Sequence, residues 1–397
     1  MDALYDAAMT NDKPARARRA LYDDEHEAFR DSFRSFLESR VVPQYAQWER
    51  DGIVPRKVFR EAGDLGFLGM EIPEEFGGGG VSDFRFNAVI AEEIARTGTV
   101  SVGINLHNDI CVPYFLAYAN DDQRKRWLPG LASGELIAAI AMTEPGTGSD
   151  LAGIGTTATL DGDHYVLNGS KTFISNGHNA DLVIVAARTD RDADRHGGLS
   201  LIVVERDTPG FERGRNLEKI GMHAQDTAEL FFDNARVPAA NVLGKAGSGF
   251  RSLVSNLAQE RMTIAVASVA SAAQALDWAV GYVKERRVFG RSVGSYQNTR
   301  FVLASIKTEV EVMQAFVDGC VRELVAGTLT PERAAMAKLA ASELQGTATD
   351  RCLQLFGGYG YMTEYPIARA YVDARIGRIY GGTSEVMREI IGRSMGL

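Results

Sequence analysis

The chain has 397 residues, of which 45% are hydrophobic and 24% are charged. This length suits two or three domains with a large buried core, and the composition is typical of a globular protein rather than a disordered one. Lys and Arg number 43 against 52 Asp and Glu, a net charge of −9. The chain therefore lacks the basic surface of a nucleic-acid-binding protein, and its acidic surface argues against adhesion to anionic membranes.

The three cysteines, Cys111, Cys320 and Cys352, are widely spaced and odd in number. They predict no disulfide framework and favour a reducing compartment. The longest uninterrupted apolar run, Leu136–Met142, is far shorter than the ~18 residues of a membrane span. Asp2 and Asp6, with no apolar stretch beside them, lead us to expect no secretory signal. We expect a bacterial cytoplasmic protein without integral membrane contact, with the mitochondrial matrix as the alternative.

Residues 1–142 are predicted to form an N-terminal α-helical domain. Apolar residues recur at helical spacing, as at Phe33, Phe36 and Leu37. Pro43 is expected to end one helix, and Pro55 to begin another. A further helix is expected from about residue 84 to residue 96.

Residues 143–245 are predicted to form a middle β domain, a small barrel or sandwich. Two short runs with strand composition, residues 157–160 and 164–167, flank Asp161-Gly162, a two-residue hairpin signal. Further apolar, β-branched runs predict strands at residues 182–187, 199–204 and 228–232.

Residues 246–397 are predicted to form a C-terminal α-helical bundle. One apolar face persists from Phe250 to Val283, which predicts a helix of nearly forty residues. A second helix is expected over residues 301–325, a third from Thr330-Pro331, and a last one from Thr383 or Ser384. The predicted class is α+β, with α, β and α domains in chain order.

Glycines, at 41 residues, exceed their usual share of ~7%, and they cluster. In the segment Met142–Asp150, Gly146 and Gly148 allow close backbone approach to a ligand, while Thr143 and Ser149 supply hydroxyls. The alternative is a turn that joins a helix to a strand. The spacing matches neither of the common nucleotide-binding glycine loops.

Three other segments combine an aromatic ring, a cation or glycines with a turn. In Phe173–Gly177, an aromatic next to a hydroxyl suits a flat heterocycle, whereas the alternative is a core Phe. Arg286–Gly290, with Gln297 beyond, suits either pyrophosphate binding or a favourable helix-dipole contact. The clusters at 354–360 and 380–385 adjoin helices, where backbone N–H groups bind anions or polarise a carbonyl; the alternative is simple capping.

Glu260 lies on the apolar stripe of the long predicted helix, in line with Leu253, Leu257 and Ile264. A carboxylate there is costly unless it is paired or functional, and burial would raise its pKa towards that of a base useful near neutral pH. The alternative is an ion pair with an Arg of a neighbouring chain.

Taken together, four segments make the chain resemble the flavin-dependent acyl-CoA dehydrogenase family, from about Tyr22 to Gly392. They are residues 141–150, 168–177, 286–290 and 354–358. The resemblance implies three domains, a homotetramer and FAD in each subunit, and it implies no metal. The long-chain members are the most similar type, followed by the isovaleryl type.

The resemblance also implies site residues. It places FAD against Ile140, Ala141, Met142, Thr143, Gly148, Ser149, Phe173, Ile174, Ser175, Thr383, Ser384 and Glu385, and it places the adenylate half against Arg286, Phe289 and Gln297 of a neighbouring subunit with Gln354, Leu355, Phe356, Gly357 and Gly358. The acyl-CoA is expected to contact Ser149, Arg251, Ala258, Gln259, Arg261, Gly381 and Gly382.

One position departs from the pattern of many members. They carry a catalytic Glu where this chain has Gly381, after Tyr380. Long-chain and isovaleryl members instead carry the base in a Glu-Arg pair on the long helix, which corresponds here to Glu260-Arg261. The resemblance therefore implies Glu260 as the catalytic base, with the Gly381 N–H as a donor to the thioester carbonyl.

The implied reaction is α,β-dehydrogenation of an acyl-CoA to the trans-2-enoyl-CoA in fatty-acid or branched-chain catabolism. Electron-transfer flavoprotein is the implied acceptor. Alternatives on the same fold are an acyl-CoA oxidase and an acyl-carrier-protein dehydrogenase. A flavin-binding or packing subunit without activity is the alternative outside the enzymes.

Overall fold

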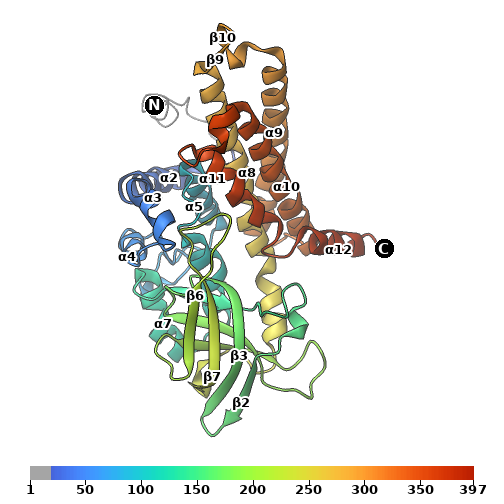
Figure 1. Ribbon diagram of the computed structural model, residues 1–397. Helices are drawn as coiled ribbons and strands as arrows, with labels where there is room; N and C mark the ends of the chain where they lie inside the picture. Colours follow the sequence, from blue (N-terminus) through green and yellow to red (C-terminus); the bar gives the residue numbers. More distant parts are fainter. Residues whose placement is uncertain (1–18) are drawn as a thin grey trace.

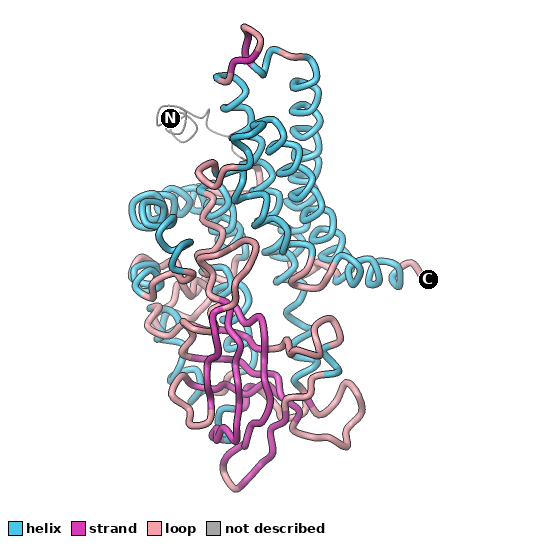
Figure 2. Tube along the Cα trace, viewed as in Figure 1, coloured by secondary structure: helices cyan, strands magenta, loops and turns pink. Residues whose placement is uncertain are grey.

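The computed structural model describes residues 19–397 and is shown in Figures 1 and 2. The first 18 residues of the predicted N-terminal domain lie outside this range. Helices form one end of the molecule and one side of the other end, where the sheet lies (Figure 2). The order along the chain is helical, then β, then helical, as predicted.

The N-terminal helices are separated by short connections and by two π-helical turns. Pro43 was expected to end a helix, and this prediction is wrong: Pro43 lies in the first turn of α3, directly after the first π turn. A proline is tolerated there because its missing N–H would have no partner within the helix. The elements are α2 (Asp24–Phe36), η1 (Leu37–Val41), α3 (Val42–Asp51), α4 (Lys57–Asp64), η2 (Glu74–Phe76), α5 (Phe84–Thr97), η3 (Leu106–Cys111), α6 (Val112–Tyr118) and α7 (Asp121–Ser133).

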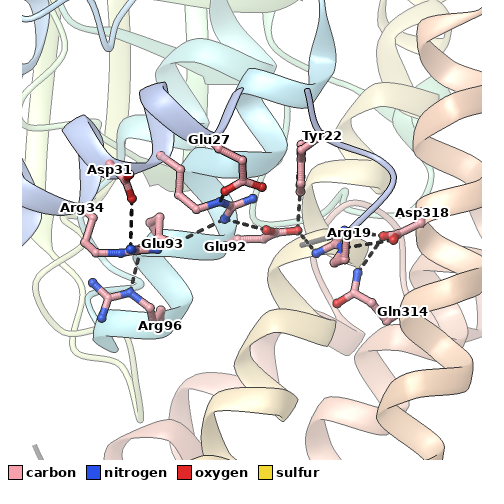
Figure 3. A network of polar contacts seen from close by, with 11 residues as sticks. Arg19, Tyr22, Glu27, Asp31, Arg34, Glu92, Glu93, Arg96, Gln314 and Asp318 are labelled. Carbon is pink, nitrogen blue, oxygen red and sulfur yellow. Dashed lines mark hydrogen bonds and ion pairs between the residues drawn. The ribbon is translucent and has the colours of Figure 1, made fainter. Parts of the chain in front are cut away.

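A network of ion pairs ties these helices together and to the C-terminal helices (Figure 3). Glu93 on α5 is 3% exposed and accepts from Arg34 at 3.0 Å and from Arg96 at 2.7 Å. Burial alone would raise the pKa of Glu93, but these arginines hold it below its usual value. Arg19, before α2, bonds Asp318 on α9 through Nε at 3.0 Å. The network therefore joins segments that are far apart in the sequence.

The middle region is an eight-stranded sheet with the order β6-β7-β3-β2-β4-β5-β8, and β1 pairs in parallel with β4. The β2–β3 hairpin closes at the Asp161–His164 pair, so its loop begins at Gly162, whose φ is +63°. The strands are β1 (Ala138–Ala141), β2 (Thr157–Asp161), β3 (His164–Ser175), β4 (Leu182–Arg188), β5 (Leu199–Glu205), β6 (Phe211–Asn216), β7 (Thr227–Pro238) and β8 (Val242–Leu243), with η4 (Leu151–Gly153) and η5 (Ala239–Asn241) between them.

The C-terminal region is built around α8, which runs through the molecule from the sheet to the far end (Figure 1). By length and composition α8 could cross a membrane, but 83% of its most apolar window is buried inside the protein, as in the core helix of a globular domain. The elements are α8 (Gly249–Glu285), β9 (Arg287–Val288), β10 (Arg291–Ser292), η6 (Val293–Ser295), α9 (Gln297–Val325), α10 (Pro331–Phe356), η7 (Gly357–Tyr361), α11 (Pro366–Asp373), η8 (Ala374–Arg378) and α12 (Ser384–Ser394).

Candidate active site

Glu260 is buried, at 4% exposure, on the fourth turn of α8. Its Oε1 accepts hydrogen bonds from the Tyr114 hydroxyl at 3.0 Å and from the Asn256 amide at 3.2 Å. Burial raises the pKa of Glu260 to about 7, and the two hydrogen bonds oppose this rise. A carboxyl group with this pKa can exchange a proton near neutral pH.

The π turn η3 clamps the segment of α8 that carries Glu260. Gln259 donates to the Asp109 carbonyl at 3.1 Å, and the Thr263 hydroxyl donates to the Asp109 carboxyl at 2.9 Å. Asp109 is fully buried, which raises its pKa to about 7. π turns inside helices are frequent at functional sites, and this one fixes the helix on both sides of Glu260.

The glycine turn before α12 lies against the same segment of α8. Gly381 and Gly382 have φ values of +63° and +95°, a backbone region that favours glycine. A side chain at Gly381 would collide with Cδ1 of Ile264, one turn beyond Glu260. Gly381 thus lies against Ile264, which is one helical turn from Glu260 on α8.

A buried ion pair between Lys171 and Glu144 supports the glycine-containing loop at residues 143–149. Lys171 on β3 is fully buried and donates to the Met142 carbonyl at 3.0 Å and to Glu144 at 2.8 Å. Glu144 also accepts from the backbone N–H groups of Gly155 and Thr156, at 2.7 and 2.8 Å. Burial lowers the pKa of Lys171 to about 8, against the attraction of Glu144.

The rim of this loop is open. A side chain at Gly146 or Gly148 would touch nothing within 4 Å. The backbone of Thr143 accepts from the N–H of Thr172 at 2.9 Å, so the loop lies beside the end of β3. The predicted residues of both segments, from Ile140 to Ser149 and from Phe173 to Ser175, are therefore adjacent.

Phe173 is not a core residue, so that alternative is wrong. Its side chain is 67% exposed, and its φ of +60° is uncommon for a bulky residue. The register between β3 and β7 shifts between Lys171 and Ile174, which turns Phe173 outward. Ile174 is 3% exposed, so only its backbone is free to meet a ligand.

A second set of predicted cofactor residues lies at the far end of α8, near β9 and β10 (Figure 1). Arg286 caps the end of α8 and stacks on the Tyr359 ring at 5.4 Å, and Phe289 is 96% exposed. Between Glu260 and Arg286 the helix spans roughly 40 Å, at ~1.5 Å per residue.

At this far end Gln297 begins α9, Gln354–Phe356 ends α10, and Gly357 and Gly358 begin η7. Gln297, Gln354, Gly357 and Gly358 are exposed, whereas the Phe356 ring packs on Tyr282 at 4.3 Å in the core. One chain therefore does not bring the two sets of cofactor residues together.

The remaining predicted residues of α12 lie next to the glycine turn. The Thr383 hydroxyl caps α12 by accepting from Val386 N–H at 3.3 Å. Ser384 is buried and Glu385 is exposed.

A chain of contacts leads from Ser149 to Arg251. Asp150 forms an ion pair with Arg195, and the neighbouring His196 ring lies 4.8 Å from the Phe250 ring. His196, Phe250 and Arg251 line a surface hollow of about 420 Å³, together with Lys245. Cations in such a hollow suit a phosphorylated ligand.

Ala258 and Arg261 lie in the same turns of α8 as Glu260. Ala258 is half-buried. Arg261 is 5% exposed, and its Nε has no hydrogen-bond partner within residues 19–397.

Three family models match, described as the N-terminal, middle and C-terminal domains of acyl-CoA dehydrogenase, over residues 23–135, 139–235 and 247–396. A mitochondrial long-chain specific acyl-CoA dehydrogenase from Sus scrofa is 46% identical over 378 residues, 95% of this chain and 88% of that protein. The chain belongs to the acyl-CoA dehydrogenase family. The resemblance and the three-part fold predicted from the sequence are thereby confirmed.

Solved structures of family members have the same fold as this chain. The crystal structure of an acyl-CoA dehydrogenase from Geobacillus kaustophilus has a TM-score of 0.93 and 48% identity, covering 97% of this chain and 100% of that one. A glutaryl-CoA dehydrogenase from Mycobacterium smegmatis, solved in complex with FADH2, has a TM-score of 0.87 and 28% identity, covering 94% of this chain and 95% of that one.

Several residues that build this acyl-CoA dehydrogenase site were not found by sequence reasoning. Asn256 precedes Glu260 by four residues, a spacing that could have marked it as a neighbour on the helix. Tyr114 comes from a distant segment, and nothing local to it indicates its contact. The buried lysines, Lys171 and Lys338, resemble ordinary surface residues in the sequence.

Proposed function

We propose that the protein oxidises an acyl-CoA to the trans-2-enoyl-CoA, with Glu260 as the acceptor of the α-proton. The observation that carries the proposal is the buried Glu260 carboxyl, one helical turn from the Ile264 side chain that the Gly381 turn meets, in a chain whose family is acyl-CoA dehydrogenase. A base and a carbonyl-binding N–H at one point are what deprotonation next to a thioester carbonyl requires.

The chain's own residues prepare Glu260 for proton transfer. Both hydrogen bonds, from Tyr114 and from Asn256, end on Oε1, so we assign the proton transfer to Oε2. The bonds hold the carboxylate in place, and burial makes it a stronger base than an exposed Glu. The bound acyl chain excludes water and strengthens this effect.

The Gly381 N–H donates to the thioester carbonyl oxygen, where negative charge develops as the α-proton leaves. A preorganised backbone donor of this kind stabilises such charge without reorganisation. The glycine has no carboxyl group of its own, so the base is supplied by Glu260 on α8.

FAD is the cofactor we propose, and when bound it accepts the hydride from the β-carbon. The open loop at Gly146 and Gly148 and the exposed ring of Phe173 fit a flat ligand lying on the end of β3. Thr143 and Ser149 supply hydroxyls at the same place. The solved relative in complex with FADH2 supports this choice.

A neighbouring subunit completes the cofactor site. Arg286 is separated from Glu260 by roughly 40 Å along α8, and Gln297 begins α9 beyond that end, so we propose that both residues hold the adenylate half of FAD bound in another subunit. A homotetramer with domains at residues 1–142, 143–245 and 246–397 is the assembly that the family resemblance implies.

The thioester handle is proposed to be CoA rather than a carrier protein. CoA ends in a phosphorylated adenosine, which the cationic hollow at Lys245 and Arg251 suits. Electrons are proposed to pass to electron-transfer flavoprotein, in a bacterial cytoplasm or a mitochondrial matrix. Oxygen consumption without an added acceptor would instead indicate an oxidase.

The test is bleaching of the flavin absorbance by acyl-CoAs of graded length and branching, under anaerobic conditions. We expect rapid bleaching by at least one saturated acyl-CoA and none by its alkyl thioether analogue, which lacks the carbonyl. A protein that binds FAD stoichiometrically but is bleached by no acyl-CoA or acyl-carrier protein would refute the proposed function.

A further inference from the structure

A buried lysine contacts the glycine turn before α12. Lys338 on α10 is fully buried, and its Nζ donates to the Gly382 carbonyl at 2.6 Å. This acceptor is uncharged. The charge of the Glu385 carboxylate acts on Lys338, but the Glu385 side chain is 80% exposed. An ammonium buried against a carbonyl carries a desolvation cost that an ordinary structural contact does not explain.

The glycine turn needs an anchor. Two successive residues with positive φ and no side chains, Gly381 and Gly382, give the backbone more freedom than other residues would. Before the turn, Tyr380 N–H bonds the Ile376 carbonyl at 3.1 Å, and after it Thr383 caps α12. Between these two points, the bond from Lys338 holds the turn.

A second cation lies near Lys338. Arg261 on α8 is 5% exposed with an unpartnered Nε, and its charge acts with burial to lower the pKa of Lys338 to about 8. Arg261 follows Glu260 directly and precedes Ile264, which meets Gly381. One buried cation, Lys338, thus bonds the turn that presents the Gly381 N–H, and a second, Arg261, acts on Lys338 by its charge.

We propose that Lys338 is a positioning residue for the reaction. Through the Gly382 carbonyl it fixes the direction of the Gly381 N–H, and together with Arg261 it adds positive potential where the thioester oxygen gains charge. The inference rests on the proposed function and deepens it. Preorganised positive charge at such a point stabilises the enolate-like transition state more than the ground state.

The experiment uses the FAD-loaded protein and a bound chromophore that needs no turnover. The absorbance of cinnamoyl-CoA, a conjugated enoyl thioester, shifts to longer wavelength when its carbonyl is polarised. Lys338→Met removes the charge and the hydrogen bond, whereas Lys338→Gln keeps an amide donor for Gly382 without the charge. Lys125→Met, at an exposed lysine on α7, is the matched control.

In Lys338→Met we expect a smaller red shift and flavin reduction by acyl-CoA slowed at least tenfold, though less than the ~100- to 1000-fold that follows loss of an oxyanion donor itself. Lys338→Gln should recover part of both. Affinity for an alkyl-CoA thioether, which lacks the carbonyl, should stay unchanged in all variants. Lys125→Met should behave as the wild type.

A wild-type red shift in both Lys338 variants would overturn the inference. An equal loss of affinity for the thioether would do so too, since it would assign Lys338 a purely structural role. If the wild-type protein itself shows neither red shift nor bleaching, the proposed function fails and the inference fails with it. The wild-type measurement therefore separates the two failures.

Discussion

Replacing Glu260 by Gln should stabilise the folded protein at alkaline pH. Burial raises the pKa of Glu260 from 4.5 to about 7, and each pKa unit between the folded and unfolded states corresponds to ~1.36 kcal/mol, so ionised Glu260 costs the folded state about 3 kcal/mol above pH 7. Gln has no charge to desolvate, and its Oε1 can accept the bonds from Tyr114 and Asn256. The buried Glu260 carboxylate thus lowers the stability of the folded protein while it gains reactivity as a base.

The sign of the pH dependence follows from the raised pKa. Below pH 4.5 the carboxyl is protonated in both states, and Gln gains little over Glu. As the pH rises from 4.5 to about 7 the unfolded state loses its proton first, so the wild type loses stability over this window. Above about pH 7, the Gln variant keeps its full advantage in folding stability over the wild type.

The assay is thermal unfolding of both proteins at saturating FAD, from pH 5 to pH 8. The Gln variant should melt a few °C above the wild type at pH 8, with a difference that shrinks towards pH 5. Glu75→Gln, at an exposed carboxylate, should show no such trend. Equal melting temperatures at pH 8, or a less stable Gln variant, would refute the assigned burial cost.

Three further variants probe the site. Tyr114→Phe removes a bond to the Glu260 carboxylate, so the acid limb of the rate profile should move by about one unit to higher pH; an unmoved limb contradicts the contact. Arg251→Ala should raise the KM for acyl-CoA about tenfold at unchanged kcat. An unchanged KM would contradict the binding of CoA in the hollow at Lys245 and Arg251. Gly381→Glu should restore flavin reduction to Glu260→Gly only when Ile264 is also shortened to Ala, because Cδ1 of Ile264 blocks a side chain at 381; equal rescue with intact Ile264 contradicts that packing.

Much of the fold could be predicted from local sequence patterns. The apolar stripe of α8 and the Thr330-Pro331 start of α10 depend on residues close together in the chain, and both appear in the structure. Pro43 failed as a helix stop because a π turn before it lets the helical path continue. Such a turn has no sequence marker.

The candidate site could be predicted only in part, because some of its contacts join residues far apart in the sequence. Glu260 was noticeable as an acid on an apolar face, which is a local anomaly. Tyr114 and Lys338 act through contacts with residues 146 and 44 positions away, and tertiary packing alone creates those contacts. A buried lysine has the same composition signal as a solvated one.

The role of Phe173 shows how a local pattern can remain ambiguous. Its neighbours form a strand with a buried face, which suits a core Phe as well as a ligand contact. Only the register shift in β3, which comes from pairing with β7, turns the ring outward.

Glu260→Gln tests the central claim most directly, through the rate at which an acyl-CoA reduces the flavin in a stopped-flow experiment. The variant should keep FAD bound and bind acyl-CoA, while reduction slows by ~100- to 10,000-fold, the usual contribution of a general base. Reduction of the flavin at the wild-type rate would contradict Glu260 as the proton acceptor.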